Sequence, residues 1–350
     1  MILKKKHNIP LDKFINYCLY DKKNGYYMTK NPFGKTGDFI TAPNVSRLFS
    51  EMLAIWTISF WKSMGSPKRF NLVELGAGNG EMIKVMIESF KKFPTFLKAC
   101  NILIYEKSPK LSKKQKKNIN NEDVKWVKSF NKINKLPSIF IANEFFDAIP
   151  VKQYLKKNNT WYEKFVKISS KNKISFTQKK VFIKTLDKKL NFNISQGQNF
   201  IEFSPIALKY LDDILKIIKR NKGGLLIIDY GYFEKKMKNT LKAIYKHKFS
   251  KILENLGKSD ITYHINFYLI DKISKKNFNI NTCYTSQRNF LANLGIYHRA
   301  EIISKNKSFK EKANIFYRLK KLTDKNEMGE IFKVMLIKNS ENKSDIGFQN

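Results

Sequence analysis

The chain has few cysteines, and it lacks any long apolar run. Its three cysteines, Cys18, Cys100 and Cys283, are far apart and odd in number, which excludes a disulfide framework and a paired-thiolate zinc site and favours a reducing compartment. No stretch approaches ~18 consecutive apolar residues, which excludes a helix that crosses a bilayer. The start, MILKKKHNIP, lacks the features of a signal or transit peptide, so we expect the mature protein to begin near Met1.

Arginine and acidic residues are scarce beside lysine. The 350 residues carry 67 Lys and Arg against 29 Asp and Glu, a net charge of +38, yet only six of the basic residues are Arg. A basic excess invites a nucleic-acid partner because cations neutralise phosphates. The side chain that best reads phosphates and bases is Arg, however, and the lysines are spread along the whole chain. We therefore interpret the excess as a solvated lysine surface.

The first 65 residues are expected to form helices around a long loop. A helix is predicted over residues 11–20, and an ordered, functional loop with Gly, Pro and aromatic residues over 25–43. Asn44 or Ser46 can cap the next helix, which Gly65 ends. A hydrophobic share of 42% with 14% aromatics excludes a disordered chain. The length suggests two domains, or one large domain with an insertion.

From residue 70 onward, short apolar runs alternate with helical segments, which is typical of a parallel sheet covered by helices. The expected strands are 71–75, 101–106, 124–127, 138–143, 223–231, 279–285 and 332–338, and the expected helices 81–92, 205–219 and 286–295. Residues 160–168 and 173–178, joined near Lys171 and Asn172, interrupt this rhythm and are predicted to form an antiparallel hairpin inserted into the α/β unit.

A glycine-rich turn follows the first predicted strand. The strand carries Glu74 near its end, and three glycines follow at alternate positions, Gly76, Gly78 and Gly80. Glycines at a strand-to-helix turn let the backbone approach a ligand. A dinucleotide site would need G-x-G-x-x-G, and Glu81 at the place of its third glycine would repel a pyrophosphate. The pattern resembles the first motif of the Rossmann-like S-adenosylmethionine-dependent methyltransferases, whose sulfonium cofactor carries no phosphate.

Two further predicted strands end in carboxylates. The second strand ends in Glu106, which could accept hydrogen bonds from two ribose hydroxyls, although a solvated Glu at a strand end is the alternative. Residues 128–130 would lie near the adenine edge. The fourth strand ends at Asn143, after which Glu144 and Asp147 could hold a cationic substrate at the carboxyl edge of the sheet. A plain helix N-terminus capped by Asn143 or Asp147 explains one of these acids and not both.

Five segments of the chain together carry a family resemblance. They are Gly25-Tyr-Tyr with Gly37-Asp-Phe-Ile-Thr-Ala-Pro43, Glu74 to Gly80, Asn143-Glu-Phe-Phe-Asp-Ala-Ile-Pro150, Ile228-Asp-Tyr-Gly-Tyr232 and Asp260-Ile-Thr-Tyr-His264. In these segments and their order, from about residue 8 to residue 338, the chain resembles the MidA family, which contains the mitochondrial complex I assembly methyltransferase and its bacterial relatives. The sequence departs from the family pattern at Phe49-Ser-Glu51, usually Phe-Gly-Glu, and at Asn266, where many relatives have Asp.

The resemblance implies an α/β fold with a Rossmann-like, seven-stranded class I methyltransferase core, an N-terminal helical and loop extension and an inserted antiparallel hairpin. The expected ranges are 1–65 for the N-terminal helices and lid loop, 66–150 for the cofactor-binding half of the core, 151–204 for the inserted β segment, 205–340 for the remainder of the core and 341–350 for a flexible tail. It also implies cytoplasmic localisation for a bacterial protein, or the mitochondrial matrix for a eukaryotic one.

The implied activity is a protein methyltransferase that uses S-adenosyl-L-methionine and, as in the mitochondrial member, dimethylates an arginine of a respiratory complex I subunit. The residues expected to hold the cofactor are Glu74, Gly76, Gly78, Gly80, Glu106 and Asn143, with Asp38 and Thr41 on the lid loop. The residues expected to act in catalysis are Glu144 and Asp147, which would pair with the guanidinium, and His264 as a proton acceptor. No metal is expected.

Three other functions stay open. A nucleic-acid methyltransferase would share the cofactor motif, but would usually carry Asn-Pro-Pro-Tyr where this chain has Asn143-Glu-Phe-Phe. An assembly factor that binds the cofactor without catalysis would keep the same fold. The glycine spacing disfavours an NAD-dependent oxidoreductase. Residues 151–195 and the basic region near 300–325 could dock a protein substrate or form a homodimer, and the sequence does not choose between these roles.

Overall fold

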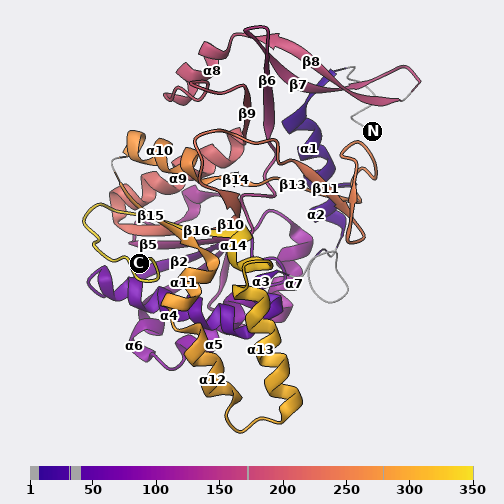
Figure 1. Cartoon of the computed structure of the whole chain (residues 1–350). Helices are drawn as coiled ribbons and strands as arrows, with labels where there is room; N and C mark the ends of the chain where they lie inside the picture. Colours follow the sequence, from indigo (N-terminus) through magenta and orange to yellow (C-terminus); the bar gives the residue numbers. More distant parts are fainter. Residues whose placement is uncertain (1–7, 31, 33–40, 172, 279, 350) are drawn as a thin grey trace. The chain divides into compact units, whose positions relative to one another are not determined.

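The computed structural model describes residues 8–30, 32, 41–171, 173–278 and 280–349 (Figure 1). They form two compact units, each built from three stretches of the chain. The first unit takes its residues from 1–30, 146–212 and 232–277, and the second from 31–145, 213–231 and 278–350. The units are interleaved along the chain, whereas the ranges expected from the sequence are consecutive.

The sheet of the second unit has seven strands in one continuous series among the described residues. Their order is β15 (Asn281–Ser286), β16 (Phe332–Lys338), β10 (Gly223–Tyr232), β5 (Ser138–Asn143), β2 (Phe70–Leu75), β3 (Cys100–Tyr105) and β4 (Lys125–Val127). The strands from β10 to β4 pair in parallel, and β16 is antiparallel to both of its neighbours. The predicted α/β fold with a Rossmann-like, seven-stranded core is confirmed.

The parallel pairing places the ends of three strands at one edge of this sheet. Glu74 of β2 pairs with Ile104 of β3 and with Ile141 of β5. The turns after β2, β3 and β5 therefore lie side by side. Because ligands of parallel α/β sheets bind outside the carboxyl ends of the strands, this register fixes where a binding site can form.

Helices of the second unit flank the sheet and form its core with it. They are α3 (Ala42–Val45), α4 (Arg47–Ser63), α5 (Glu81–Phe90), α6 (Pro94–Ala99), α7 (Pro109–Ile119), α11 (Gln287–Asn293), α12 (Ile296–Ser304), α13 (Phe309–Thr323) and α14 (Met328–Ile331), with the 3-10 turn η2 (Phe130–Lys132). Ser46 caps α4 as predicted, since its hydroxyl accepts from the amide of Leu48 at 3.2 Å. Trp56 and Phe60 of α4 stack at a ring distance of 5.1 Å and are fully buried.

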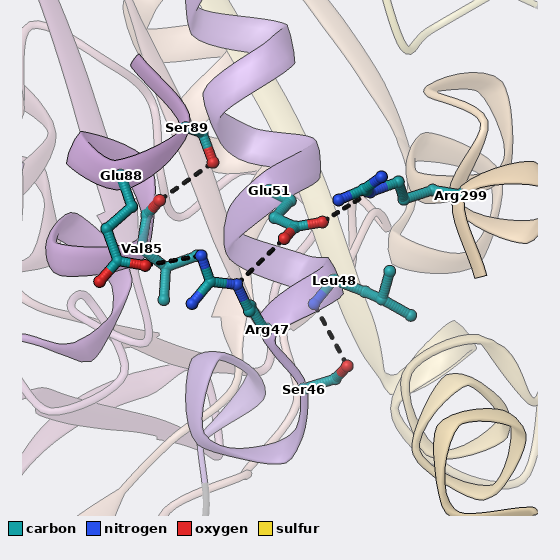
Figure 2. A network of polar contacts seen from close by, with 8 residues as sticks. All are labelled: Ser46, Arg47, Leu48, Glu51, Val85, Glu88, Ser89 and Arg299. Atoms are coloured by element: carbon teal, nitrogen blue, oxygen red, sulfur yellow. Dashed lines mark hydrogen bonds and ion pairs between the residues drawn. The ribbon is translucent and has the colours of Figure 1, made fainter. Parts of the chain in front are cut away.

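A network of ion pairs joins α4 to α5 and α12 (Figure 2). Glu51 accepts from Arg47 at 3.1 Å and from Arg299 at 2.8 Å, while Arg47 also reaches Glu88 at 2.6 Å. Burial alone would raise the pKa of Glu51, but the two arginines hold it below its ordinary value. Glu51, which ends the Phe49-Ser-Glu segment, therefore joins α4 to α12, and Arg47 joins α4 to α5.

The first unit is built on antiparallel sheets. Its larger sheet has the order β1 (Asn8–Pro10), β7 (Thr160–Ile168), β6 (Lys152–Lys157) and β9 (Phe200–Phe203), with β8 (Ile174–Val181) paired to β7. A smaller one joins β12 (Lys248–Ser250), β11 (Lys242–Tyr245) and β13 (Asp260–Thr262). The remaining elements are α1 (Leu11–Tyr20), α2 (Tyr26–Thr29), α8 (Ile183–Leu190), β14 (Ile265–Asn266) and α10 (Phe267–Phe278), and α9 (Pro205–Asn221) runs through both units.

The predicted hairpin is present as β7 and β8, but it is part of a larger sheet. Ile9 of β1 pairs with Val166 of β7, which brings the start of the chain to this sheet. Asn172, predicted at the hairpin turn, lies outside the described residues. A hairpin buries little apolar surface by itself, so the addition of β1, β6 and β9 gives the insertion a core of its own, with Trp161 and Ile201 among its buried residues.

In the part of the chain that the structure describes, no helix combines the length and the apolar character that a membrane crossing requires.

Candidate functional site

A pocket lies at the carboxyl edge of β2 and β5, within the second unit. Its lining includes six of the residues predicted from the sequence and four others, and the full set is Thr41, Pro43, Glu74, Gly76, Ala77, Gly78, Asn79, Met82, Asn143 and Glu144. Gly80 and Glu106 are not part of this lining. Asp38 lies outside the described residues.

The turn after β2 needs glycine for steric reasons. Gly76, Gly78 and Gly80 have φ angles of +68°, +53° and +83°, a region that L side chains rarely adopt. A Cβ on Gly76 would lie 2.7 Å from the ring of Phe145, and one on Gly80 would lie 3.1 Å from Ile119. The side chains of Phe145 and Ile119 therefore occupy the space that a Cβ on Gly76 or Gly80 would need. The backbone of the turn lines the pocket at Gly76 and Gly78.

Within the part of the chain that the structure describes, two buried oxygen atoms of the pocket residues have no hydrogen-bond donor. Glu74 is 4% exposed, and among the described residues its Oε2 atom accepts no hydrogen bond; the same is true of Asn143 Oδ1. Burial, and then the charge of Glu106, raise the pKa of Glu74 to about 8. A buried acceptor without a donor costs about 1–3 kcal/mol. Two of them in one pocket fit a ligand that brings hydrogen-bond donors and positive charge.

Glu106 lies beside the pocket and is held by α7. Its carboxylate accepts from the amide of Ser108 at 2.8 Å and from Gln115 Nε2 at 2.9 Å. Burial raises the pKa of Glu106, although these hydrogen bonds lower it in part. The same Gln115 Nε2 donates to the carbonyl of Gly78 at 3.0 Å, and its Oε1 accepts from Trp126 at 2.9 Å. One fully buried side chain thus joins the glycine turn to the carboxylate after β3.

Sequence reasoning missed Gln115. It lies between Leu111 and Ile119 at helical spacing, so a polar residue occupies the apolar stripe of α7. A buried polar side chain is normally hydrogen-bonded. This interruption of the stripe is the signal that could have identified it.

A chain of amides connects the glycine turn to the loop before α3. Asn118 donates to the carbonyl of Asn79 at 3.0 Å, Asn79 donates to Asn44 at 2.8 Å, and Asn44 donates to the hydroxyl of Thr41 at 2.7 Å. Thr41, predicted to bind cofactor, is therefore fixed against the turn after β2. Asn44, considered as a helix cap, serves this chain, and Ser46 is the cap of α4.

Glu144 has a strained backbone, with a φ angle of +49°. Its amide donates to the carbonyl of Ile228 at 2.9 Å, and its Oε1 atom accepts from the amide of Ala42 at 3.2 Å. The next amide, of Phe145, donates to the buried carboxylate of Asp229 at 3.2 Å. Such strain is kept only where the surroundings impose it, and it concentrates at functional positions.

Asp147 and His264 belong to the first unit, whereas Glu144 belongs to the second. Asp147 is buried, and its carbonyl accepts from the amide of Tyr263 at 3.3 Å. Burial, and then the charges of Lys242 and Lys238, lower the pKa of His264 to about 4, so its ring is neutral near pH 7.

Two of the motif segments meet within the first unit. The hydroxyl of Tyr27, from the Gly25-Tyr-Tyr segment, donates to Asp260 at 2.8 Å, and its ring stacks on Tyr20 at 5.5 Å. The Asp260-Ile-Thr-Tyr-His264 segment is therefore anchored to α1 and α2. Among the described residues, no group of three or more His, Cys, Asp or Glu side chains could hold a metal ion.

Curated proteins of similar sequence are named as arginine methyltransferases. "Protein arginine methyltransferase NDUFAF7, mitochondrial" of Xenopus laevis is 27% identical over 354 residues, which cover 93% of this chain and 80% of that protein. The Homo sapiens protein of the same name is 27% identical and covers 84% and 72%. The Drosophila melanogaster homolog is 29% identical and covers 79% and 68%.

A solved structure shares the fold. A COG1565 superfamily member from Burkholderia thailandensis, bound to S-adenosyl-homocysteine, aligns with a TM-score of 0.83 at 22% identity over 99% of this chain and 91% of that one. The sequence profile of the family described as "Putative S-adenosyl-L-methionine-dependent methyltransferase" matches residues 52–285. The chain therefore belongs to this family of methyltransferases, and S-adenosyl-L-methionine is its methyl donor.

Proposed function

We propose that the protein transfers methyl groups to an arginine of another protein. Three observations support this. Its relatives are named as protein arginine methyltransferases, the pocket after β2 suits the donor, and a glutamate with a strained backbone lines the same pocket. Of these, Glu144 carries most of the argument, because a carboxylate that lines this pocket could pair with the guanidinium of a substrate arginine.

The residues of the pocket fit S-adenosyl-L-methionine. Glu74 and Asn143 offer buried acceptors to its ammonium group. Glu106 would accept from the ribose hydroxyls, since each carboxylate oxygen has two lone pairs and the contacts from Ser108 and Gln115 leave acceptor capacity. When bound, the cofactor supplies an electrophilic methyl group on a sulfonium leaving group. Gly76 and Gly78 line the pocket without side chains, so the backbone of the turn can approach the cofactor closely.

The main task of the protein is then to align the guanidinium with the methyl carbon and the sulfur. Alignment alone can lower the barrier by several kcal/mol. A guanidinium is a poor nucleophile because its pKa is ~13.8 and its electrons are delocalised. Pairing with a carboxylate can localise the charge on one nitrogen and leave another free to attack. We assign this role to Glu144, whose carboxylate is oriented by the amide of Ala42 and by Asn143 Nδ2 at 3.3 Å.

Asp147 is the predicted second carboxylate, and His264 the predicted proton acceptor. With a pKa of about 4 the His264 ring is neutral and can take up a proton, but it is a weak base. Loss of its side chain should therefore reduce the rate less than loss of Glu144. That the substrate is a subunit of respiratory complex I, and that two methyl groups are added, remain predictions from the family resemblance.

The test is transfer from labelled S-adenosyl-L-methionine into a lysate from cells that lack the protein, followed by mass spectrometry. We expect label on arginine of a protein. Label in RNA would favour a nucleic-acid methyltransferase, and no label with intact cofactor binding would favour an assembly factor. Glu144→Ala should abolish transfer while the Kd for S-adenosyl-homocysteine stays nearly unchanged; an equal weakening of cofactor binding would show that Glu144 serves the cofactor instead.

A further inference from the structure

The α12 and α13 hairpin carries a segment that is almost entirely in solvent. In Figure 1 these two helices run side by side, and the loop that joins them lies at the end of the hairpin remote from the sheet of the second unit. Of the first ten residues of α13, 309–318, nine are exposed and Ile315 is half-buried. A helix exposed on nearly every side is stabilised little by packing, so its composition reflects something other than the core.

We name residues 305–321 the basic tip. It carries seven basic side chains against one acidic side chain, a net charge of +6, and the basic residues are Lys305, Lys307, Lys310, Lys312, Arg318, Lys320 and Lys321. The single acid, Glu311, forms the capping box of α13 with Ser308 and pairs with Lys307 at 3.2 Å. The basic tip therefore presents positive charge with little internal compensation.

Large apolar side chains are exposed within the same segment. Phe309, at the first position of α13, is 88% exposed, Tyr317 is 58% exposed and Phe316 is 42% exposed. Phe309 and Phe316 are seven residues apart, so they share one face of the helix. Ile302 of α12 is 43% exposed as well. Single exposed apolar residues are ordinary, but several of them on a protruding basic helix mark an interaction surface.

We propose that the basic tip docks on the surface of an anionic lipid bilayer, with Phe309 inserted among the head groups and the lysines on the lipid phosphates. Basic residues near a charged bilayer each contribute about 1 kcal/mol, and a basic helix with exposed Phe is typical of peripheral binding. A second copy of this chain would bring an equal positive charge to the contact and be repelled. A nucleic acid would favour arginine, and the basic tip has one arginine, Arg318, which donates to the carbonyl of Val45 at 2.9 Å.

The experiment is co-sedimentation of the full chain with phosphatidylcholine vesicles, with and without phosphatidylserine. We expect binding only with phosphatidylserine, and weaker binding as salt is added because the attraction is screened. Phe309→Ser and the triple variant Lys305→Gln, Lys310→Gln, Lys312→Gln should each reduce binding by at least ~10-fold. Methyl transfer is not needed for this readout, so failure of the proposed function would leave it intact.

The chain offers matched controls on α8. Phe182, the N-cap residue of α8, is 84% exposed, and α8 carries Lys184, Lys188 and Lys189. Phe182→Ser and the triple Lys→Gln variant of α8 therefore make the same chemical changes away from the basic tip. These variants should bind vesicles like the wild type. An equal loss of binding would overturn the proposal in favour of a general charge effect. Unchanged vesicle binding in the basic-tip variants would also overturn the proposal. So would variants that bind vesicles normally but lose binding to RNA or to an acidic peptide, or lose self-association in light scattering.

Discussion

Two buried glutamates, one in each unit, differ in how their oxygen atoms are used. Glu202 in the first unit is 3% exposed, and both oxygens have donors, the amide of Thr240 at 3.0 Å and Gln153 Nε2 at 2.5 Å. Glu74 in the second unit is 4% exposed, and within the described residues its Oε2 has none. Burial raises the pKa of both carboxyls.

The comparison separates structural burial from a binding site. A buried carboxylate whose oxygen atoms all have hydrogen-bond donors holds neighbouring segments together. Glu202 joins its own strand, β9, to the segment at Thr240 in this way. A buried carboxylate that keeps an acceptor vacant next to a pocket lowers the stability of the ligand-free protein in exchange for ligand affinity. Burial and a raised pKa alone would have marked both residues as candidates.

The largest expected effect concerns cofactor affinity. Glu74→Gln removes the carboxyl group that can ionise and pair with the cofactor ammonium group, and we expect the Kd for S-adenosyl-homocysteine to rise by roughly 100-fold or more. Glu202→Gln should leave that Kd unchanged and lower the free energy of unfolding by about 1–3 kcal/mol, because one donor loses its acceptor. Calorimetric titration and chemical denaturation of both variants check this. If Glu74→Gln and Glu202→Gln bind S-adenosyl-homocysteine with equal Kd, the distinction between a binding and a structural glutamate would be wrong.

The glycine turn provides the next comparison. Gly76→Ala should lower the free energy of unfolding by about 2–3 kcal/mol, because it adds a clash with Phe145 to the cost of a positive φ angle. The control is Gly65→Ala, where φ is +85° and, chain neighbours aside, no atom of the described residues lies within 4 Å of the added Cβ. Its cost should be about 1 kcal/mol. If urea denaturation shows that the two variants lose similar free energies of unfolding, backbone strain alone would explain why residue 76 is glycine.

A smaller effect is expected at α7. Gln115→Leu breaks the link between Gly78 and Glu106, so we expect the Kd for S-adenosyl-homocysteine to rise about 10-fold, with a matching loss of stability. Gln287 is also fully buried and donates to the carbonyl of Leu322 at 2.9 Å, remote from the pocket residues. Gln287→Leu should cost stability without weakening cofactor binding. If both variants bind cofactor alike, Gln115 has only a structural role.

The smallest effect concerns pH. Because the pKa of Glu74 is about 8 in the folded protein against 4.5 ordinarily, its contribution to stability is fully present below pH 4.5 and is lost as the pH rises to about 8. The ligand-free wild type should therefore lose Tm relative to Glu74→Gln between these pH values, by a few degrees. Thermal unfolding of both proteins across this range tests the sign. A constant difference would show that Glu74 keeps its ordinary pKa.

The sequence alone predicts the local parts of the site. The strand β2, with Glu74 near its end, and the alternate glycines are contiguous in the sequence. The turn that they form can be predicted because the steric rules for glycine act within a few residues. The same holds for α1, which begins and ends at the predicted residues, and for the cap at Ser46. The parallel pairing of the central strands also follows from the alternation of strand and helix patterns.

What the sequence alone does not predict depends on contacts between distant residues. The link from Gln115 to Gly78 and Glu106, the vacant acceptors at Glu74 and Asn143, and the pairing of Ile9 with Val166 exist only once the chain has folded. Composition and spacing give the type of each side chain, but hydrogen-bond satisfaction depends on which donors the tertiary fold brings within about 3 Å. The sequence thus determined the chemistry of the glycine turn, and the tertiary structure determined which buried carboxylate remains available to a ligand.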